Sequence, residues 1–338
     1  MTAVTQRLAQ AAAWRLERLA QRLDGLRRAL VVVNYHRLYH TALDTPFDEG
    51  VFGDVSLEYF RRQLQWLRQN TQVLSEDDVL RGLADPKTLP RRGVLITFDD
   101  GYRDNFQLAY PALRDHGLFA LFFVPTGPLL ERRLGWWDQA AFLVKKAKGR
   151  SLRLEGATYP LDTLDQRRKL IAVLHERFKT APEAQTRGLL DDLAHDLDSE
   201  FPSAELQDAE LMTFEQLGEM SRAGMAVGAH THSHRVLATL SAEVQRRELA
   251  QGKAVLEERL GKPVRSLAYP VGRKDSFGEV TKGLAREAGY LMAFSFYSGF
   301  NRPGRMDPMD LRRSFKRKPF EAFTASILYP GRELRPMA

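Results

Sequence analysis

The sequence predicts a parallel α/β fold, with a (β/α) barrel as the leading choice, on three observations. Short apolar, β-rich runs alternate with helical patterns along most of the 338 residues. Glycines stand where the predicted helices should end, at Gly117, Gly224, Gly261 and Gly289. Clusters of polar residues come directly after predicted strands, which is where parallel α/β folds place their functional side chains.

The elements follow from hydrophobic periodicity. Each predicted strand is a short apolar run: Leu30–Tyr35, Thr71–Leu74, Val94–Phe98, Phe119–Val124, Met225–Ala229, Val264–Tyr269 and Tyr290–Phe296, with a weaker one near Leu311–Phe315. The predicted helices between them are Ser56–Gln69, Ser75–Ala84, Asn105–His116, Thr213–Ala223, Ser241–Leu260 and Phe277–Ala288.

One stretch, Gly127–Leu211, departs from this alternation because it holds no convincing strand. It contains the run Gly135-Trp136-Trp137-Asp138 and predicted helices near Asp162–Lys179 and Pro182–Leu197. We interpret it as an insertion that forms a helical cap beside the site, since βα loops at this end of a barrel carry function. The expected organisation is an amphipathic helix at 1–29, a barrel at 30–320 with the insertion at about 128–211, and a C-terminal tail at 321–338.

Composition limits the chemistry. The chain has no cysteine, so disulfides and thiolate ligands are excluded and any metal must be held by His, Asp or Glu. The net charge of +7 suits an acidic glycan, an anionic lipid surface or nucleic acid, although ordinary solubility charge explains it equally simply. We expect no nucleic-acid partner, because no binding motif accompanies the charge.

The first thirty residues contain too many charges for a secretory signal, and no apolar run is long enough to span a bilayer. These features predict a cytoplasmic protein. Leu16, Leu19, Leu23, Leu26 and Leu30 form one apolar stripe with arginines on the other faces. This helix would pack on the domain or on a second copy, or lie on an anionic membrane as a peripheral contact. The oligomeric state is left open.

The first polar cluster is Thr97-Phe98-Asp99-Asp100-Gly101-Tyr102, at the end of a predicted strand. Two adjacent acids at the end of a buried strand are costly unless they are paired or bind a metal. Neighbours on an extended chain point in opposite directions, so one carboxylate could bind a metal and the other a water. The simpler alternative is an Asp-Asp-Gly turn or helix cap.

The second cluster is His230-Thr231-His232-Ser233-His234. His230 and His234 are four residues apart, and on one helical turn that spacing places two imidazoles on the same side. With a carboxylate from another strand they would form a catalytic metal site with an open position for water. His232 is expected to face away.

The third cluster is Leu267-Ala268-Tyr269-Pro270-Val271-Gly272, again a strand followed by a loop. Together, and in this order, the three clusters resemble the polysaccharide deacetylase family, also called the NodB-homology domain or carbohydrate esterase family 4. The early Tyr35-His36-Arg37 and the later Ala288-Gly289-Tyr290 resemble the branch found in exopolysaccharide synthesis loci.

The resemblance implies a distorted (β/α) barrel of about seven strands and a role for each matching residue. Asp99 would be the general base, and Asp100, His230 and His234 the metal ligands. The backbone N–H of Tyr102 would hold the oxyanion. The residues expected to shape the site or line the substrate groove are Thr97, Phe98, Tyr269 and Pro270.

The chain departs from the family pattern in two places. Many members carry an arginine that orients the base where this chain has Ala268, so that support is absent or comes from elsewhere. The usual late acid histidine is also missing, because no histidine follows His234. His36, at the end of the strand Leu30–Tyr35, matches permuted members that carry the acid on an N-terminal strand, and we predict that it is the general acid.

The predicted function is therefore the metal-dependent removal of N-acetyl groups from amino sugars of a polysaccharide, oligosaccharide or lipid-linked precursor. The metal would be Zn²⁺, with Ni²⁺, Co²⁺ or Fe²⁺ as alternatives. The alternatives are a catalytically impaired glycan-binding member, an O-acetyl esterase and another metal hydrolase.

Trp136 and Trp137 would stack on sugar rings or anchor the insertion. A basic run would meet an anionic glycan or lipid phosphate, or be a solvated face: Arg312, Arg313, Lys316, Arg317 and Lys318.

Overall fold

A computed structural model gives the arrangement of most of the chain. It describes residues 29–40, 45–47, 55–181, 183–299, 301–302, 304–314 and 319–329. The predicted amphipathic helix at 1–29, apart from Ala29, and Lys316, Arg317 and Lys318 lie outside the described residues. Within the described part, no helix combines the length and the apolar character needed to cross a membrane.

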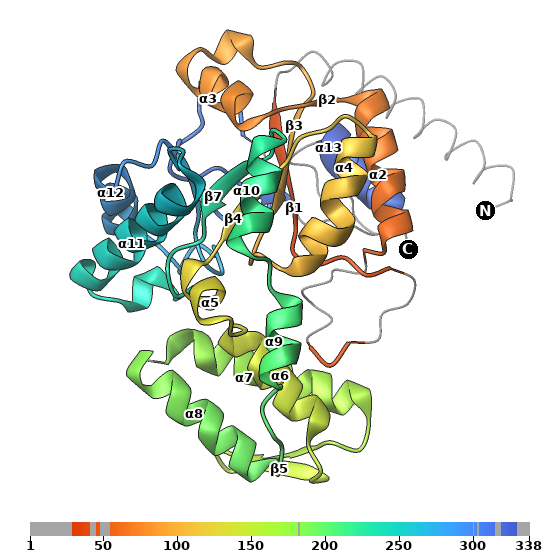
Figure 1. Cartoon of the computed structure of the whole chain (residues 1–338), viewed down its shortest axis with the longest axis vertical. Helices are drawn as coiled ribbons and strands as arrows, with labels where there is room; N and C mark the ends of the chain where they lie inside the picture. Colours follow the sequence, from red (N-terminus) through yellow and green to blue (C-terminus); the bar gives the residue numbers. More distant parts are fainter. Residues whose placement is uncertain are drawn as a thin grey trace, which may run out of the picture.

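The centre of the molecule is a parallel sheet in which seven strands follow the order β10-β1-β3-β4-β7-β8-β9 (Figure 1). The short β2 pairs with β3 outside this path. Leu311, two residues before β10, exchanges backbone hydrogen bonds with residues 293 and 295 at the end of β9, and this contact nearly closes the sheet into a barrel. The predicted fold class is confirmed. The parallel strands are β1 (Leu30–Tyr35), β2 (Gln72–Val73), β3 (Gly93–Phe98), β4 (Leu121–Val124), β7 (Ala226–Ala229), β8 (Ser266–Ala268), β9 (Met292–Phe294) and β10 (Arg313–Ser314).

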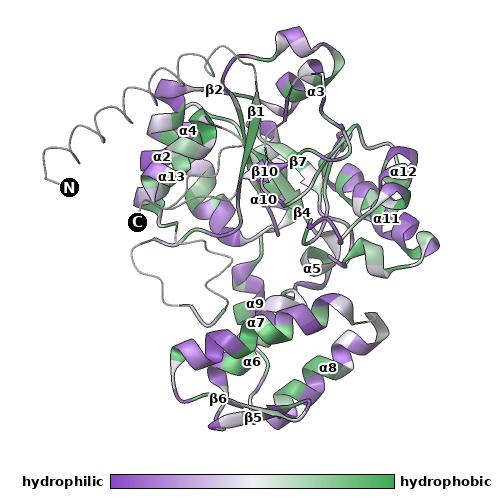
Figure 2. Cartoon of the chain, turned by 180° about the vertical axis from the view of Figure 1, so that it is seen from behind, coloured by the Kyte–Doolittle hydropathy of each residue, from purple (hydrophilic) through white to green (hydrophobic). Residues whose placement is uncertain are grey.

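Helices surround the sheet, and their polar faces point outward (Figures 1 and 2). Several begin at a Ser or Thr whose side chain accepts a backbone N–H, as at Ser56, Ser75, Thr213 and Ser241. The surrounding helices are α2 (Leu57–Asn70), α3 (Glu76–Ala84), α4 (Tyr110–Asp115), α5 (Thr126–Glu131), α10 (Phe214–Arg222), α11 (Ala242–Leu260), α12 (Glu279–Glu287) and α13 (Phe320–Leu328), with short turns η2 (Pro86–Thr88), η3 (Asn105–Ala109) and η4 (Leu237–Thr239).

Strand residues alternate between two hydrophobic layers, as the two-residue period requires. On β1, Leu30 and Val32 belong to a cluster inside the barrel, whereas Val31 and Val33 belong to the layer beneath the helices. Phe123 and Phe294 pack against each other within the interior in a tilted arrangement, with ring centroids 5.2 Å apart. The interior is therefore packed, and its polar side chains are concentrated where the strands end.

The insertion forms a second lobe with its own hydrophobic cluster (Figure 1). Its helices are α6 (Trp136–Lys146), α7 (Leu164–Thr180), α8 (Glu183–Asp196) and α9 (Ala204–Glu210). The expectation that this stretch holds no strand is wrong, because β5 (Ser151–Leu154) and β6 (Ala157–Pro160) form an antiparallel hairpin. Its turn residues Glu155 and Gly156 both have positive φ, and most strand residues are exposed, so the apolar alternation is weak.

Two further expectations differ from the structure. The predicted single helix Asn105–His116 is a π-helical turn, η3, followed by α4, and Pro111 lies at the junction. Residues 321–328, expected to be part of a tail, belong to α13, whose Phe323 and Ile327 are buried in the main core.

Gly252 sets the distance between α11 and the loop that carries the histidines. A Cβ at Gly252 would lie 2.7 Å from the backbone carbon of Thr231, which no side-chain rotation can relieve. We expect Gly252→Ala to lower the free energy of unfolding by about 1–3 kcal/mol, measured by urea denaturation. Gly283→Ala, in α12, is the matched control because a Cβ there meets nothing within 4 Å. It should be neutral or stabilising by up to about 1 kcal/mol, and equal effects of both substitutions would contradict this close approach.

Candidate metal centre and active site

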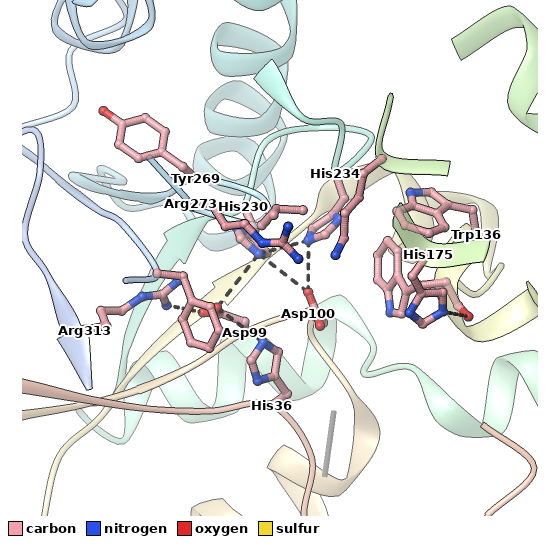
Figure 3. Close-up of a pocket in the computed structure, with 14 residues that line it drawn as sticks. His36, Asp99, Asp100, Trp136, His175, His230, His234, Tyr269, Arg273 and Arg313 are labelled. Carbon is pink, nitrogen blue, oxygen red and sulfur yellow. Dashed lines mark hydrogen bonds and ion pairs between the residues drawn. The ribbon is translucent and has the colours of Figure 1, made fainter. Parts of the chain in front are cut away.

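The three polar clusters meet in one pocket at the carboxyl ends of the strands (Figure 3). Asp99 and Asp100 follow β3, and His230 and His234 follow β7. Tyr269 and Val271 follow β8, His36 follows β1, and Arg313 comes from β10. The described residues that line the pocket are His36, Asp99, Asp100, Trp136, Trp137, His175, Lys179, His230, His234, Tyr269, Val271, Arg273, Phe296 and Arg313.

Asp100, His230 and His234 form a group that could hold a metal ion, with donor atoms within 4.8 Å of one another. Asp100 Oδ1 lies 3.6 Å from His230 Nε2 and 3.4 Å from His234 Nε2. The two Nε2 atoms are 3.2 Å apart. Asp100 Oδ1 is buried and has no hydrogen-bond partner among the described residues, so a buried carboxylate oxygen faces two imidazole nitrogens. This set fits a divalent cation.

The pKa shifts agree with that fit. Burial raises the pKa of Asp100 well above its usual range, and the neighbouring carboxylates of Asp99 and Asp138 raise it further. Burial lowers the pKa of His230 and, together with the charge of His230, lowers that of His234 well below its usual range. Neutral imidazoles are the form that binds a metal.

A hydrogen bond to the backbone of β8 orients the imidazole ring of His230. Its Nδ1 lies 2.7 Å from the carbonyl oxygen of Ala268, so the Nδ1–H donates to this oxygen and Nε2 presents a lone pair to the pocket. Trp137 packs against His234 with ring centroids 4.2 Å apart. The Trp137 indole N–H donates to the Tyr102 hydroxyl at 2.7 Å, and this hydroxyl donates to Asp138 at 2.8 Å.

The histidine loop is not a helical turn, so the predicted reason for the pairing of His230 and His234 is wrong although the two side chains do meet. Thr231 and His234 both have positive φ, and the chain turns back on itself between them. His232 faces away from the pocket, as expected: its Nδ1 lies 2.8 Å from Thr126 Oγ1 and its Nε2 lies 3.1 Å from Gln251. Glu248 fixes this turn by accepting the backbone N–H groups of residues 232 and 233.

Asp99 is held by a buried arginine. Arg313 Nη1 donates to Asp99 Oδ1 at 2.7 Å and to Asn34 Oδ1 at 2.9 Å, and its Nε donates to the Ser295 carbonyl at 2.8 Å. Burial alone would raise the pKa of Asp99, but Arg313, followed by His230 and His36, lowers it to about 2. The second oxygen, Oδ2, lies 3.8 Å from His36 Nε2. Asp99 is therefore ionised; Oδ1 is held by Arg313, and Oδ2 accepts a longer hydrogen bond, of 3.3 Å, from Asn34 Nδ2 and lies toward His36.

The family model described as polysaccharide deacetylase matches residues 86–160 and 201–293. The chain belongs to the polysaccharide deacetylase family. The gap in the match, residues 161–200, lies within the inserted lobe of this family member.

One curated relative is distant in sequence from this chain. YxkH of Bacillus subtilis (strain 168), whose name assigns it to the polysaccharide deacetylases, is 24% identical over 241 residues, covering 71% of this chain. The match spans only 58% of the length of YxkH.

Solved structures share the fold. IcaB from Ammonifex degensii is 22% identical, with a TM-score of 0.55 over 89% of this chain and 97% of that one. The Streptococcus pyogenes deacetylase PplD is 19% identical, with a TM-score of 0.55 over 85% and 92% of the two chains. The BpsB deacetylase domain from Bordetella bronchiseptica is 19% identical, with a TM-score of 0.53 over 86% and 96%.

The remaining predicted site residues lie at different distances from the pocket. Trp137 lines it but is almost buried. Tyr269 is among the lining residues, but its ring points away from the aspartates and histidines (Figure 3), and its hydroxyl donates to the Met309 carbonyl. Thr97 lies beneath the pocket, with its Oγ1 2.7 Å from Asn34 Oδ1. Pro270 is buried and is not among the described residues that line the pocket.

Arg313 is the functional residue that the sequence reasoning placed wrongly. It was expected to belong to a basic run that meets an anionic ligand or solvent, but its side chain is 1% exposed and it contacts Asp99. It supplies the support that is absent at Ala268. A signal was present in the sequence: Leu311 and Arg313 are two residues apart on a predicted strand, so they share the face that points into the barrel.

Removing the arginine should unbalance a buried charge. We expect Arg313→Gln to raise the pKa of Asp99 and to lower the free energy of unfolding by about 3–5 kcal/mol, because one partner of a buried pair is lost. The double variant Arg313→Gln with Asp99→Asn should recover much of this loss, since neither charge remains. Urea denaturation at pH 7 of both single variants and the double variant measures the coupling. Strictly additive effects would show that the two side chains do not interact.

Proposed function

We propose that this chain is a metal-dependent hydrolase that removes N-acetyl groups from amino sugars of a glycan or glycan precursor. The observation that carries the proposal is the convergence of Asp99, Asp100, His230 and His234 in one pocket, with His36 beside Asp99. Membership of the polysaccharide deacetylase family supports it. So do the names of two fold neighbours, PplD and BpsB, which are called deacetylases.

In this proposal Asp100, His230 and His234 hold a divalent metal, with Zn²⁺ first and Ni²⁺, Co²⁺ or Fe²⁺ as alternatives. The metal supplies activation of water and polarisation of the acetyl carbonyl. Asp99 Oδ2 accepts the proton of the attacking water, since Oδ1 is engaged by Arg313 at 2.7 Å, whereas the hydrogen bond that Oδ2 accepts from Asn34 is longer, at 3.3 Å. The low pKa of Asp99 keeps it in its basic form at neutral pH.

His36 protonates the leaving amine in this scheme. Its Nε2 faces the pocket 3.8 Å from Asp99 Oδ2, and the ring of Phe296 packs edge-on against it at 5.5 Å. The His36 carbonyl accepts a hydrogen bond of 2.7 Å from Asn105, which follows the aspartate pair along the chain. The segment that follows β3 therefore carries the proposed base, Asp99, and also holds the backbone of the proposed acid, His36. The backbone N–H of Tyr102 as oxyanion donor stays a prediction.

Arg313 bears on the alternative of a catalytically impaired, glycan-binding member. That alternative was favoured by the alanine at position 268, where many members carry the arginine that orients the base. Because Arg313 makes this contact from β10, the alanine no longer argues against activity.

We also retain as a proposal that residues 128–211 are a separate cap on a barrel formed by the rest of residues 30–320.

The metal proposal predicts equimolar binding. We expect titration of the purified protein with Zn²⁺, followed by calorimetry, to give one site, and His234→Ala and Asp100→Ala to lose it. His232→Ala is the matched control, because this histidine lies in the same loop but faces away. Equal loss of binding in His232→Ala would show that the loop, rather than the three proposed ligands, determines binding.

The catalytic proposal predicts acetate release from N-acetylglucosamine oligomers by the Zn²⁺-loaded protein. Asp99→Asn should abolish turnover while retaining the metal, because the amide cannot accept the proton. His36→Gln should lower kcat by roughly 10²–10⁴-fold, the usual contribution of one acid or base. A chelated sample is the control. A near-normal rate in Asp99→Asn would contradict the assignment of the base, and release from O-acetylated sugars alone would favour the esterase alternative.

A further inference from the structure

The side of the pocket formed by the insertion carries two cationic side chains that the proposed reaction does not use. Lys179 comes from α7 of the insertion, and Arg273 comes from the loop after β8. Figure 3 shows Arg273 near His230 and His234, with Trp136 and His175 beyond Asp100 on the side opposite to Arg313. An N-acetyl group is uncharged, so its recognition does not by itself require two cationic side chains.

One carboxylate, that of Glu176, binds both cations. Arg273 donates two hydrogen bonds to it, of 2.9 and 2.6 Å, and Lys179 donates one of 2.7 Å. Arg273 and Lys179 line the pocket, whereas the only carboxylates among the described lining residues are Asp99 and Asp100. Arg273 is the main cause that lowers the pKa of Glu176 to about 2, so Glu176 is ionised at neutral pH. The carboxylates that act on Arg273 are those of Glu176 and Asp275, and neither is among the described residues that line the pocket, so the charges presented to the pocket at this edge are the two positive ones.

The contact between Glu176 and Arg273 shows which chemistry this edge recognises. A guanidinium that holds a carboxylate through two parallel hydrogen bonds can hold a carboxylate or phosphate of a ligand in the same way. The side chains of Arg273 and Glu176 are 49% and 56% exposed, and exposed ion pairs contribute little net stability. A ligand anion can therefore replace or join Glu176 at low cost.

The position of Arg273 is fixed by its backbone. Its N–H donates to Ser276 Oγ at 3.2 Å, and Gly272, just before it, has positive φ and lies against the backbone of residue 296. A Cβ at Gly272 would lie 2.6 Å from that backbone nitrogen, so the turn depends on glycine. The guanidinium is presented from a well-defined loop beside the site.

We infer that Arg273 and Lys179 form an anion subsite, and that the substrate carries a carboxylate or a phosphate next to the N-acetylated sugar. This inference rests on the proposed function for the reaction itself. Trp136, which stacks on Phe178 with ring centroids 5.5 Å apart and lines the same edge, would contact the sugar that carries the charge. The competing explanation is that Glu176 and Arg273 only fasten the insertion to the barrel.

Two substitutions separate these explanations, because they break the same ion pair from opposite sides. Arg273→Gln removes a cation that would bind the ligand, whereas Glu176→Gln removes the anion that competes with it. A subsite predicts opposite effects on acidic substrates, and a simple fastening predicts the same effect from both. Arg246→Gln is the matched control, since Arg246 pairs with Glu287 on an exposed surface, does not line the pocket and carries the same charge.

The measurement is kcat/KM for acetate release by the Zn²⁺-loaded protein at low ionic strength. The substrates are neutral N-acetylglucosamine oligomers, oligomers of alternating glucuronic acid and N-acetylglucosamine, and UDP-N-acetylglucosamine. We expect an acidic substrate to be preferred over the neutral one. Arg273→Gln should lower this preference by about tenfold, the contribution of a charge-assisted hydrogen bond. Glu176→Gln should raise it, and Arg246→Gln should leave it unchanged.

The three substrates also identify the anion. Preference for the glucuronic acid oligomer supports a carboxylate, and preference for UDP-N-acetylglucosamine supports a phosphate. Equal use of all three, or shifts in the same direction for Arg273→Gln and Glu176→Gln, would overturn the subsite.

Calorimetric binding of the same compounds to the Asp99→Asn protein provides a readout independent of turnover. If the Asp99→Asn protein binds the acidic compounds more tightly and the Zn²⁺-loaded unsubstituted protein releases acetate from none of the substrates, the proposed function is overturned and the subsite is supported. Acetate release without an acidic preference would overturn the subsite and leave the proposed function standing.

Discussion

The buried ion pair between Arg313 and Asp99 joins the closure of the barrel to the chemistry of the pocket. Arg313 belongs to β10, which pairs with β1, and Asp99 follows β3 on the other side of β1. Between them Asn34 accepts from Arg313 and donates to Asp99. Burial of the two charged groups and the amide inside a packed barrel is possible because each of the three forms hydrogen bonds with the other two. The pair holds the carboxylate in place and ionised, and this position exists only when β10 has joined the sheet.

Around this pair the backbone itself is constrained. Four of the seven described non-glycine residues with positive φ belong to the loops at the pocket: Asp100, Thr231, His234 and Val271. Such conformations cost of order 1–3 kcal/mol each and persist only where the surroundings enforce them. Here Glu248 holds the histidine turn, and the close approach of α11 at Gly252 leaves it no room to relax. The strained backbone and the contacts that hold it are therefore found where the metal-ligand atoms of Asp100, His230 and His234 must converge.

Residues of the second lobe take part in the site. Trp137 contacts His234 and donates to the hydroxyl of Tyr102, so α6 is tied to the loop that carries the aspartates. Arg37, buried beneath, pairs with Asp104 and Glu210 and lies over the ring of Tyr102. The loops after β1 and β3 and the two ends of the insertion therefore share one buried polar network. A lobe tied to the barrel in this way can position substrate groups on its pocket side, where Lys179 and Trp136 lie.

The sequence by itself determined the barrel, most of its elements and the four residues whose side chains converge. Strand and helix periods, capping residues and glycine stops are local signals, and adjacent motif residues such as Asp99 and Asp100 are read directly from the chain. The tertiary structure alone decided the partner of Asp99, because Arg313 is 214 residues away and reaches it only across a closed sheet. It also decided that the histidine loop is a strained turn and that Lys179 and Arg273, from distant segments, both line the pocket and bind Glu176. Each depends on burial and on contacts between distant segments, which no local pattern encodes.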